Sequence, residues 1–122
     1  MYKASKDHPT QAKLAECRML NDAKEYEMQF TEEQLLIQDM AKSFAQEQIK
    51  PNAAEWDKHS IFPKETLSQM GQLGFMGMLI SEQWGGSDTG NLAYVLALEE
   101  IAAADGATST IMSVHNSVGC VP

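Results

Sequence analysis

Apolar residues recur at helical spacing along most of the chain after Phe30. Between residues 36 and 49 they form one stripe, made of Leu36, Ile37, Met40, Ala41, Phe44, Ala45 and Ile49. The opposite side of the same stretch carries Gln38, Asp39, Lys42, Gln46 and Glu47, so the pattern predicts a surface helix with one buried face. Thr31 and Gln34 have the spacing of a capping box, and we expect Thr31 to be the N-cap of this helix.

Two prolines divide the middle of the chain. Pro51 lacks a backbone N–H and restricts the residue before it, so the first helix should kink or end near Ile49 and Lys50. Residues 52–57 can continue as a helix anchored by Trp56. Pro63 is well placed as the first residue of a further helix, with Leu67, Met70 and Leu73 on its buried face and Gly74 at its end.

The second half of the chain begins with a loop and continues with two helical patterns. Residues 84–90 contain three glycines and form a loop by composition, whereas the apolar run 75–80 is too short to assign. Residues 92–104 are apolar nearly all round, broken only by Glu99 and Glu100. Such a helix is buried on most sides, which a small domain rarely achieves alone, so we expect it to pack against neighbours outside this chain.

The last helix is expected after Asp105-Gly106, with Thr108 or Ser109 as its cap. Ile111, Val114, His115 and Val118 follow at i, i+3, i+4 and i+7, so they share one face of a helix. That face is either plain core or the wall of an apolar ligand pocket. No segment indicates a strand, and the chain is predicted to be all-α with four or five helices.

Composition excludes several classes of function. The 122 residues carry a formal net charge of −8, from 9 Lys and Arg against 17 Asp and Glu, which argues against nucleic acid and anionic membranes as partners. No apolar run approaches a bilayer span, and the N-terminus resembles neither a signal nor a transit peptide. Cys17 and Cys120 lie at opposite ends without CxxC spacing, so we expect a reducing, cytoplasm-like compartment.

The residues that could carry chemistry have simpler alternatives. A buried Glu99 or Glu100 could act as a general base, but we favour one salt-bridged carboxylate and one at the helix rim. Gly85-Gly86 and Gly90 before a helix could bind phosphate, but a tight turn between helices is favoured because the Walker lysine is missing. His8, His59 and His115 lack companions at ligand spacing, so we predict no metal site.

Taken together, six segments resemble the N-terminal helical domain of the acyl-CoA dehydrogenases. They are, in order, Phe30-Thr31-Glu32-Glu33-Gln34, Ile49-Lys50-Pro51-Asn52-Ala53-Ala54-Glu55-Trp56-Asp57, Leu73-Gly74-Phe75-Met76-Gly77-Met78, Trp84-Gly85-Gly86, Glu99-Glu100-Ile101 and Ser113-Val114-His115-Asn116-Ser117. The resemblance runs from residue 30 to residue 122 and is strongest to the short-chain and branched short-chain members. Residues 1–29 match nothing in the family and are expected to form a polar, mobile N-terminal extension.

The resemblance implies a larger enzyme of which this chain is the first part. In that enzyme a middle β-domain and a C-terminal helical domain follow, FAD is held mainly by those domains, and a glutamate beyond this chain removes the α-proton of an acyl-CoA thioester. Electrons then pass to an electron-transferring flavoprotein, and the enzyme is a homotetramer. It would be cytoplasmic in a bacterium, or in the mitochondrial matrix in a eukaryote. The chain is expected to bind no cofactor and to be inactive by itself.

The family also implies a role for the last helical face. Ile111, Val114, His115 and Val118 align with positions that line the acyl-tail pocket in acyl-CoA dehydrogenases. They are therefore the candidate substrate-binding residues, and bulk on this wall would shorten the acyl chain that fits. Two alternatives remain open: a stand-alone helical interaction module without flavin chemistry, and a small acyl-binding protein that uses the same apolar wall.

Overall fold

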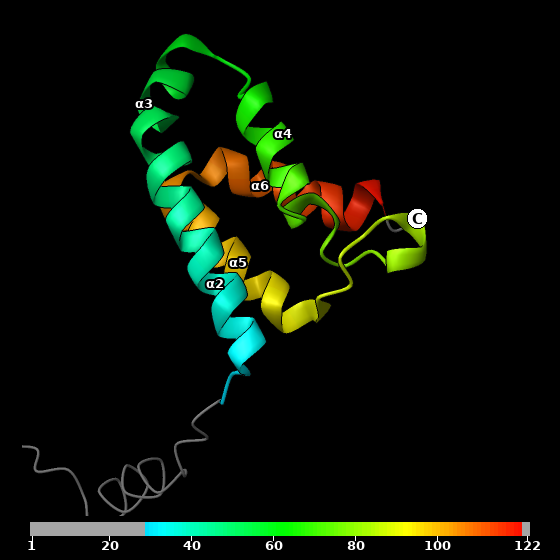
Figure 1. The fold of residues 1–122 in the computed structure, drawn as a ribbon. Helices are drawn as coiled ribbons and strands as arrows, with labels where there is room; N and C mark the ends of the chain where they lie inside the picture. Colours follow the sequence, from blue (N-terminus) through cyan, green and yellow to red (C-terminus); the bar gives the residue numbers. More distant parts are fainter. Residues whose placement is uncertain (1–28, 121–122) are drawn as a thin grey trace, which may run out of the picture.

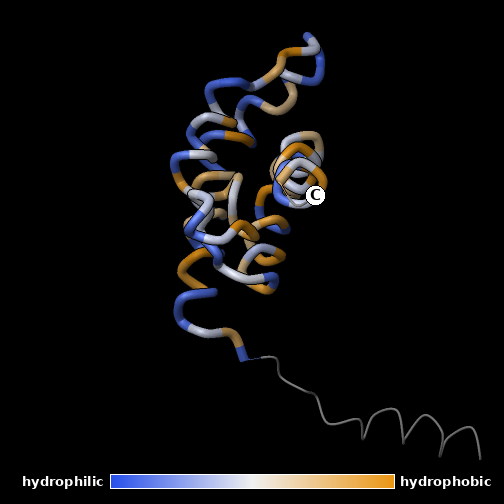
Figure 2. The backbone as a smooth tube through the Cα atoms, turned by 90° about the vertical axis from the view of Figure 1, so that its right-hand side faces the viewer, coloured by the Kyte–Doolittle hydropathy of each residue, from blue (hydrophilic) through white to orange (hydrophobic). Residues whose placement is uncertain are grey.

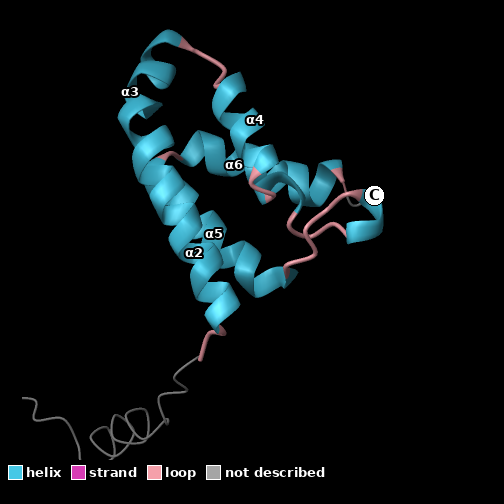
Figure 3. Cartoon of the chain, viewed as in Figure 1, coloured by secondary structure: helices cyan, strands magenta, loops and turns pink. Residues whose placement is uncertain are grey.

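A computed structural model describes residues 29–120. Within this range the secondary structure consists only of helices and loops, as Figure 3 shows. The all-α prediction is therefore confirmed. The expected N-terminal extension lies almost wholly outside the described residues, as do His8 and Cys17.

The first helical rod is built from three consecutive segments, α2 (Glu32–Phe44), the π-helical turn η1 (Ala45–Ile49) and α3 (Lys50–His59). The rod runs along one side of the molecule (Figure 1). The capping box is confirmed, because Thr31 Oγ1 accepts a hydrogen bond from the Gln34 backbone N–H at 3.2 Å and Gln34 Oε1 accepts one from the Thr31 N–H at 3.0 Å.

Pro51 neither ends the rod nor leaves it regular. It lies in the first turn of α3, directly after η1, so the helix changes at Ile49–Lys50 as predicted but continues. A proline inside an α-helix removes one hydrogen bond and its ring collides with the carbonyl four residues earlier. The wider π turn relieves this conflict: the Lys50 N–H reaches back five residues to the carbonyl of Ala45, and Asn52 Nδ2 donates to the Gln48 carbonyl at 2.9 Å.

The chain then turns back through α4 (Lys64–Gln72). Pro63 is the N-cap rather than the first residue of this helix, one position from the prediction. Gly74 follows the helix with φ +86, the left-handed conformation that favours glycine. Of the expected buried face, Met70 is fully buried but Leu73 is 41% exposed, because an open groove lies between that part of α4 and the α2–η1 rod.

Two short 3₁₀ turns, η2 (Phe75–Gly77) and η3 (Glu82–Trp84), lead into α5 (Gly90–Ala104). α5 packs beside α2 and is followed directly by α6 (Gly106–Val114) and a second π-helical turn, η4 (His115–Gly119). The core between these elements consists of the apolar side chains of Ala41, Phe44, Ala45, Ile49, Met70, Phe75, Met78, Ala93, Ala97, Ile101 and Met112. Figure 2 shows hydrophobic and hydrophilic positions recurring turn by turn along the first rod.

The described residues enclose the α5 helix only in part. Ala93, Leu96, Ala97 and Ile101 are buried, whereas Val95 is 47% exposed and Ala102 and Ala103 are also exposed. One side of the helix thus packs on α2 and α6, and the other carries apolar residues that no described element covers.

Candidate functional site

The candidate site is the outward face of α6 and η4, whose start is fixed by Asp105. This single residue separates α5 from α6: its backbone N–H makes the last hydrogen bond of α5, to the Ile101 carbonyl at 2.9 Å, and its extended backbone (φ −158, ψ 117) then ends the helix. Its carboxylate Oδ2 accepts from the Thr108 backbone N–H at 2.8 Å and from Thr108 Oγ1 at 2.6 Å. The cap is therefore Asp105 and not Thr108 or Ser109 as predicted, because a residue with extended backbone geometry before the helix is what an N-cap requires.

The four predicted site residues do not all lie in the same surroundings. Val114 and Val118 lie on the outward face and are 50% and 77% exposed. Thr110, one turn before Val114, is also exposed, and its hydroxyl donates to the Gly106 carbonyl at 2.9 Å. Sequence reasoning did not include Thr110, although the spacing of 110, 114 and 118 could have indicated it.

Ile111 is placed differently from the two valines. It is half-buried and borders a cavity of about 390 Å³ between α3 and α6, whose lining includes Trp56, Ile61 and Pro63. The prediction that Trp56 anchors the helix of residues 52–57 is confirmed, because its side chain packs against the core from α3.

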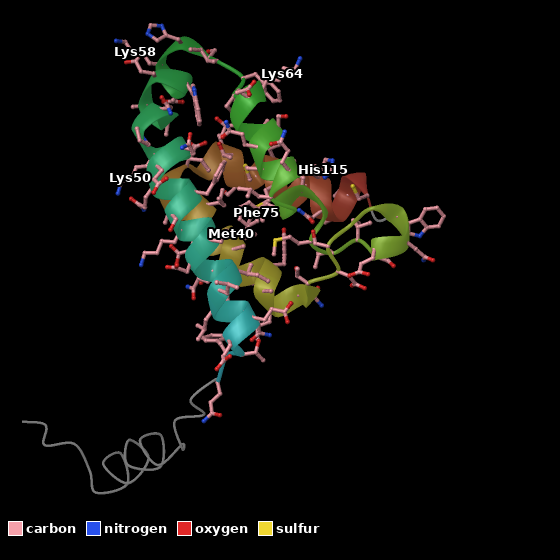
Figure 4. The ribbon with its side chains drawn as sticks, in the orientation of Figure 1. Met40, Lys50, Lys58, Lys64, Phe75 and His115 are labelled. Atoms are coloured by element: carbon pink, nitrogen blue, oxygen red, sulfur yellow. The ribbon has the colours of Figure 1, made fainter. Side chains whose placement is uncertain are left out.

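His115 contacts the turn that follows α4. Its Nδ1 lies 2.6 Å from the carbonyl oxygen of Met76, so this nitrogen carries the proton and donates. Figure 4 shows His115 and Phe75 where the turn after α4 meets η4. Cys120 Sγ lies 3.5 Å from the same nitrogen, and His115 and Cys120 border a cavity of about 240 Å³ with Trp84, Gly85 and Gly86.

The neighbouring residue, Asn116, was missed by the sequence analysis. It is fully buried, and its Nδ2 donates to the carbonyls of Phe75 at 2.8 Å and Met112 at 3.0 Å. Its Oδ1 accepts from the Leu79 backbone N–H at 3.4 Å. The sequence feature that could have indicated Asn116 is an asparagine inside an apolar helical segment. Asparagine is a poor helix former there unless its amide has hydrogen-bond partners.

The glycine-rich loop is a tight turn, as favoured above. The backbone N–H groups of five consecutive residues, 85–89, donate to carbonyls of Glu82, Ser81, Gly77, Ile80 and Met78. None of these amides is free to bind a phosphate, which is how glycine-rich loops bind nucleotides. Gly86 packs so closely on Ile80 that a Cβ there would collide with the Ile80 carbonyl.

The acidic pair has no cationic partner in the described part of the chain. Glu99 is exposed, and Glu100 Oε1 accepts from Gln38 Nε2 at 3.0 Å. The predicted salt bridge is thus replaced by an amide hydrogen bond that ties α5 to α2. Among residues 29–120, no group of three or more His, Cys, Asp or Glu side chains is arranged to hold a metal ion, and no helix is both long and apolar enough to traverse a bilayer.

Comparison with known proteins identifies this arrangement. The family model described as "Acyl-CoA dehydrogenase, N-terminal domain" matches residues 31–122. The chain belongs to the acyl-CoA dehydrogenase family. Its match begins at the capping-box threonine and includes the whole α6–η4 face.

Individual relatives agree with the family. The short-chain specific acyl-CoA dehydrogenase of Clostridium acetobutylicum is 41% identical over 88 residues, which are 72% of this chain and 23% of that protein. The human mitochondrial short-chain specific acyl-CoA dehydrogenase is 40% identical over 85 residues, 70% of this chain and 20% of the relative. This acyl-CoA dehydrogenase domain thus spans less than a quarter of the length of these relatives.

A solved structure has the same fold. A chain in a structure reported for the electron transferring flavoprotein of Acidaminococcus fermentans superposes with a TM-score of 0.68 at 35% identity. The superposition covers 72% of this chain and 23% of that one.

Proposed function

We propose that this chain is the N-terminal domain of an FAD-dependent enzyme that dehydrogenates short-chain acyl-CoA thioesters between their α and β carbons. Support comes from the family match over residues 31–122 and from relatives that are named as short-chain specific acyl-CoA dehydrogenases. The domain contributes binding surface and not the reacting groups, so it is inactive without the rest of the enzyme.

The observation that carries this proposal is the exposed apolar face of α6 and η4. Two β-branched valines, Val114 and Val118, present their methyl groups outward, and Ile111 and His115 lie at the edges of this face. Exposed apolar side chains in a row mark a surface that binds another apolar group. In the complete enzyme this face is the wall of the acyl-tail pocket.

FAD is expected in the complete enzyme but not on this domain. In the glycine loop the amides of residues 85–89 are used internally, so these amides offer no cradle for a diphosphate. As the family resemblance implies, the flavin in this proposal is held mainly by segments outside this chain, where it accepts the hydride from the substrate. The electron acceptor is an electron-transferring flavoprotein, the enzyme is a homotetramer, and its location is the bacterial cytoplasm or the mitochondrial matrix.

The test is the complete enzyme with Val114→Gly. Removing the stiff isopropyl group enlarges the pocket by three carbons, so the variant should accept longer acyl chains. We expect kcat/KM for hexanoyl-CoA relative to butyryl-CoA to rise by about tenfold or more, the discrimination that a methylene carries in an apolar pocket. The assay follows reduction of an artificial electron acceptor.

The matched control is Val95→Gly, which removes the same side chain from the exposed side of α5. This variant should leave kcat/KM for hexanoyl-CoA relative to butyryl-CoA unchanged. An unchanged ratio in Val114→Gly would show that Val114 is not the end of the pocket. A complete enzyme that oxidises no acyl-CoA would refute the proposed activity and favour an acyl-binding protein or an interaction module.

A further inference from the structure

Asn116 is a fully buried side chain of η4, and its amide carries both hydrogen-bond donors and an acceptor. Its exposed fraction is 0%, and its amide makes three hydrogen bonds to backbone atoms of Phe75, Leu79 and Met112. Two of these partners are 41 and 37 residues away in the sequence. Asn116 therefore joins the π-helical turn η4 to the turn that follows α4.

The turn at residues 75–79 is a rigid support. Phe75 and Met78 are buried in the core, and the Phe75 ring lies 6.1 Å from that of Phe44 on α2. The Met78 carbonyl accepts from both the N–H and the hydroxyl of Thr89, at 2.9 and 3.2 Å. The position of η4 is thus fixed against the core of the molecule and not only by its own helix.

The adjacent His115 adds a second connection to the same support through its 2.6 Å hydrogen bond to the Met76 carbonyl. Residues 115 and 116 thus bond to the carbonyls of residues 76 and 75. Val114 and Val118 lie immediately before and two positions after this pair, and both point outward.

A π turn closes wider hydrogen-bonded rings than an α-helix, so it alters the direction of every side chain after it, and such turns are rare and frequently lie at functional sites. A buried carbonyl that loses its donor costs more than the hydrogen bond itself gained. The amide of Asn116 therefore makes the π turn the favoured conformation of residues 115–119.

We propose that Asn116 is a positioning residue for substrate selection: by clamping η4 to the 75–79 turn, it fixes Val118 relative to Val114 and so sets the length of acyl chain that the wall accepts. This inference rests on the proposed function. In this proposal the longest acyl chain that fits depends on the valines that line the wall and also on the Asn116 amide. That amide is buried and touches no substrate.

The decisive variant is Asn116→Asp in the complete enzyme. The carboxylate keeps the size of the amide and the acceptor for the Leu79 N–H, but it cannot donate to the carbonyls of Phe75 and Met112. A second variant, Asn116→Ser, keeps one donor and places no charge in the core, so it serves if the aspartate variant does not fold. The readout is kcat/KM for butyryl-, hexanoyl- and octanoyl-CoA.

We expect both variants to change the ratio of kcat/KM between hexanoyl- and butyryl-CoA by about fivefold or more, within the range that one methylene carries. Ile101→Val and Ile101→Ala provide the control, since Ile101 is equally buried but lies on α5. Of the two Ile101 variants, the one that lowers the thermal midpoint as much as the Asn116 variant is the matched control. It should leave the ratio of kcat/KM between hexanoyl- and butyryl-CoA within twofold of wild type.

Three outcomes are distinguishable. A changed ratio in the Asn116 variants alone supports the positioning role. Equal losses for all acyl lengths, or the same change in the matched Ile101 variant, overturn it and leave Asn116 a stabilising residue only. A wild-type enzyme that oxidises no acyl-CoA overturns the proposed function itself, and the positioning role is lost with it.

Discussion

At the residue scale, the last helical segment depends on a few polar side chains. Three polar residues are buried in the described part of the chain, Thr66, Thr108 and Asn116, and two of them belong to α6 and η4. Every buried polar side-chain atom among residues 29–120 has a hydrogen-bond partner. The helix that carries the proposed acyl wall is thus fixed at its start by Asp105 and Thr108 and at its end by Asn116.

The first residue-scale prediction concerns Asp105. Asp105→Ala removes both hydrogen bonds to Thr108 and leaves the first amides of α6 without a cap. We expect the opening free energy of the first turn of α6 to fall by about 1–2 kcal/mol, the usual cost of losing an N-cap. Amide hydrogen exchange of residues 106–110 measures this.

The control is Asp105→Asn, whose side-chain oxygen can still accept from the Thr108 N–H. It should lose less than half as much protection as the alanine variant. Unchanged exchange in Asp105→Ala would mean that packing of α5 on α6, and not the cap, determines where α6 begins.

At the element scale, most helices could be predicted from the sequence because their signals are local. The capping box at Thr31, the turn at Gly74 and the change of helix at Pro51 each depend on residues within one turn of one another. The buried sides were predicted less well. Leu36 is 70% exposed and Met40 is 38% exposed, because hydrophobic spacing identifies a face but not the length over which another element covers it.

The site shows the same division between local and distant information. Helical spacing predicted one face for Val114 and Val118, which are four residues apart, and both side chains are exposed. It could not indicate that His115 bonds to Met76 or that Asn116 bonds to Phe75, because these partners are 39 and 41 residues away. The π turn was also unpredictable, since the contacts that favour it are tertiary.

The element-scale prediction concerns the loop before α5. Gly86→Ala places a Cβ against the Ile80 carbonyl, so residues 81–89 must move and lose part of their internal hydrogen bonding. We expect destabilisation of about 1–3 kcal/mol, as for overpacking in a core. The emission of Trp84, which is 80% exposed on this loop, reports the change.

Gly85→Ala is the matched control, because no atom lies near the position its Cβ would take. It bears only the backbone cost of φ +82. A Gly86 variant as stable as the Gly85 variant would show that the loop adapts freely to the added Cβ.

At the scale of the whole molecule, large apolar side chains remain uncovered on several sides. Among residues 29–120 the exposed ones are Leu35, Leu36, Met40, Ile61, Phe62, Leu73, Trp84, Val95, Val114 and Val118. This agrees with the expectation that the apolar α5 helix packs against partners outside the chain.

We therefore predict that the 122-residue chain by itself is loosely packed. It should unfold over a broad thermal range and bind the dye ANS, while far-UV circular dichroism retains the helical signal. The complete enzyme should bind little dye at the same concentration. A sharp, cooperative transition of the isolated chain without dye binding would show that its own core is sufficient.

The pairing of α2 with α5 has a consequence for synthesis on the ribosome. The last residue of α2 is Phe44 and the last of α5 is Ala104, so its partner is complete only 60 residues later. At a synthesis rate of about 5–20 residues per second, the apolar side of α2 stays uncovered for roughly 3–12 s until α5 is complete. The nascent chain thus exposes this apolar side early, and because a single residue separates α5 from α6, the core can close soon after α5 is complete, once α6 has followed.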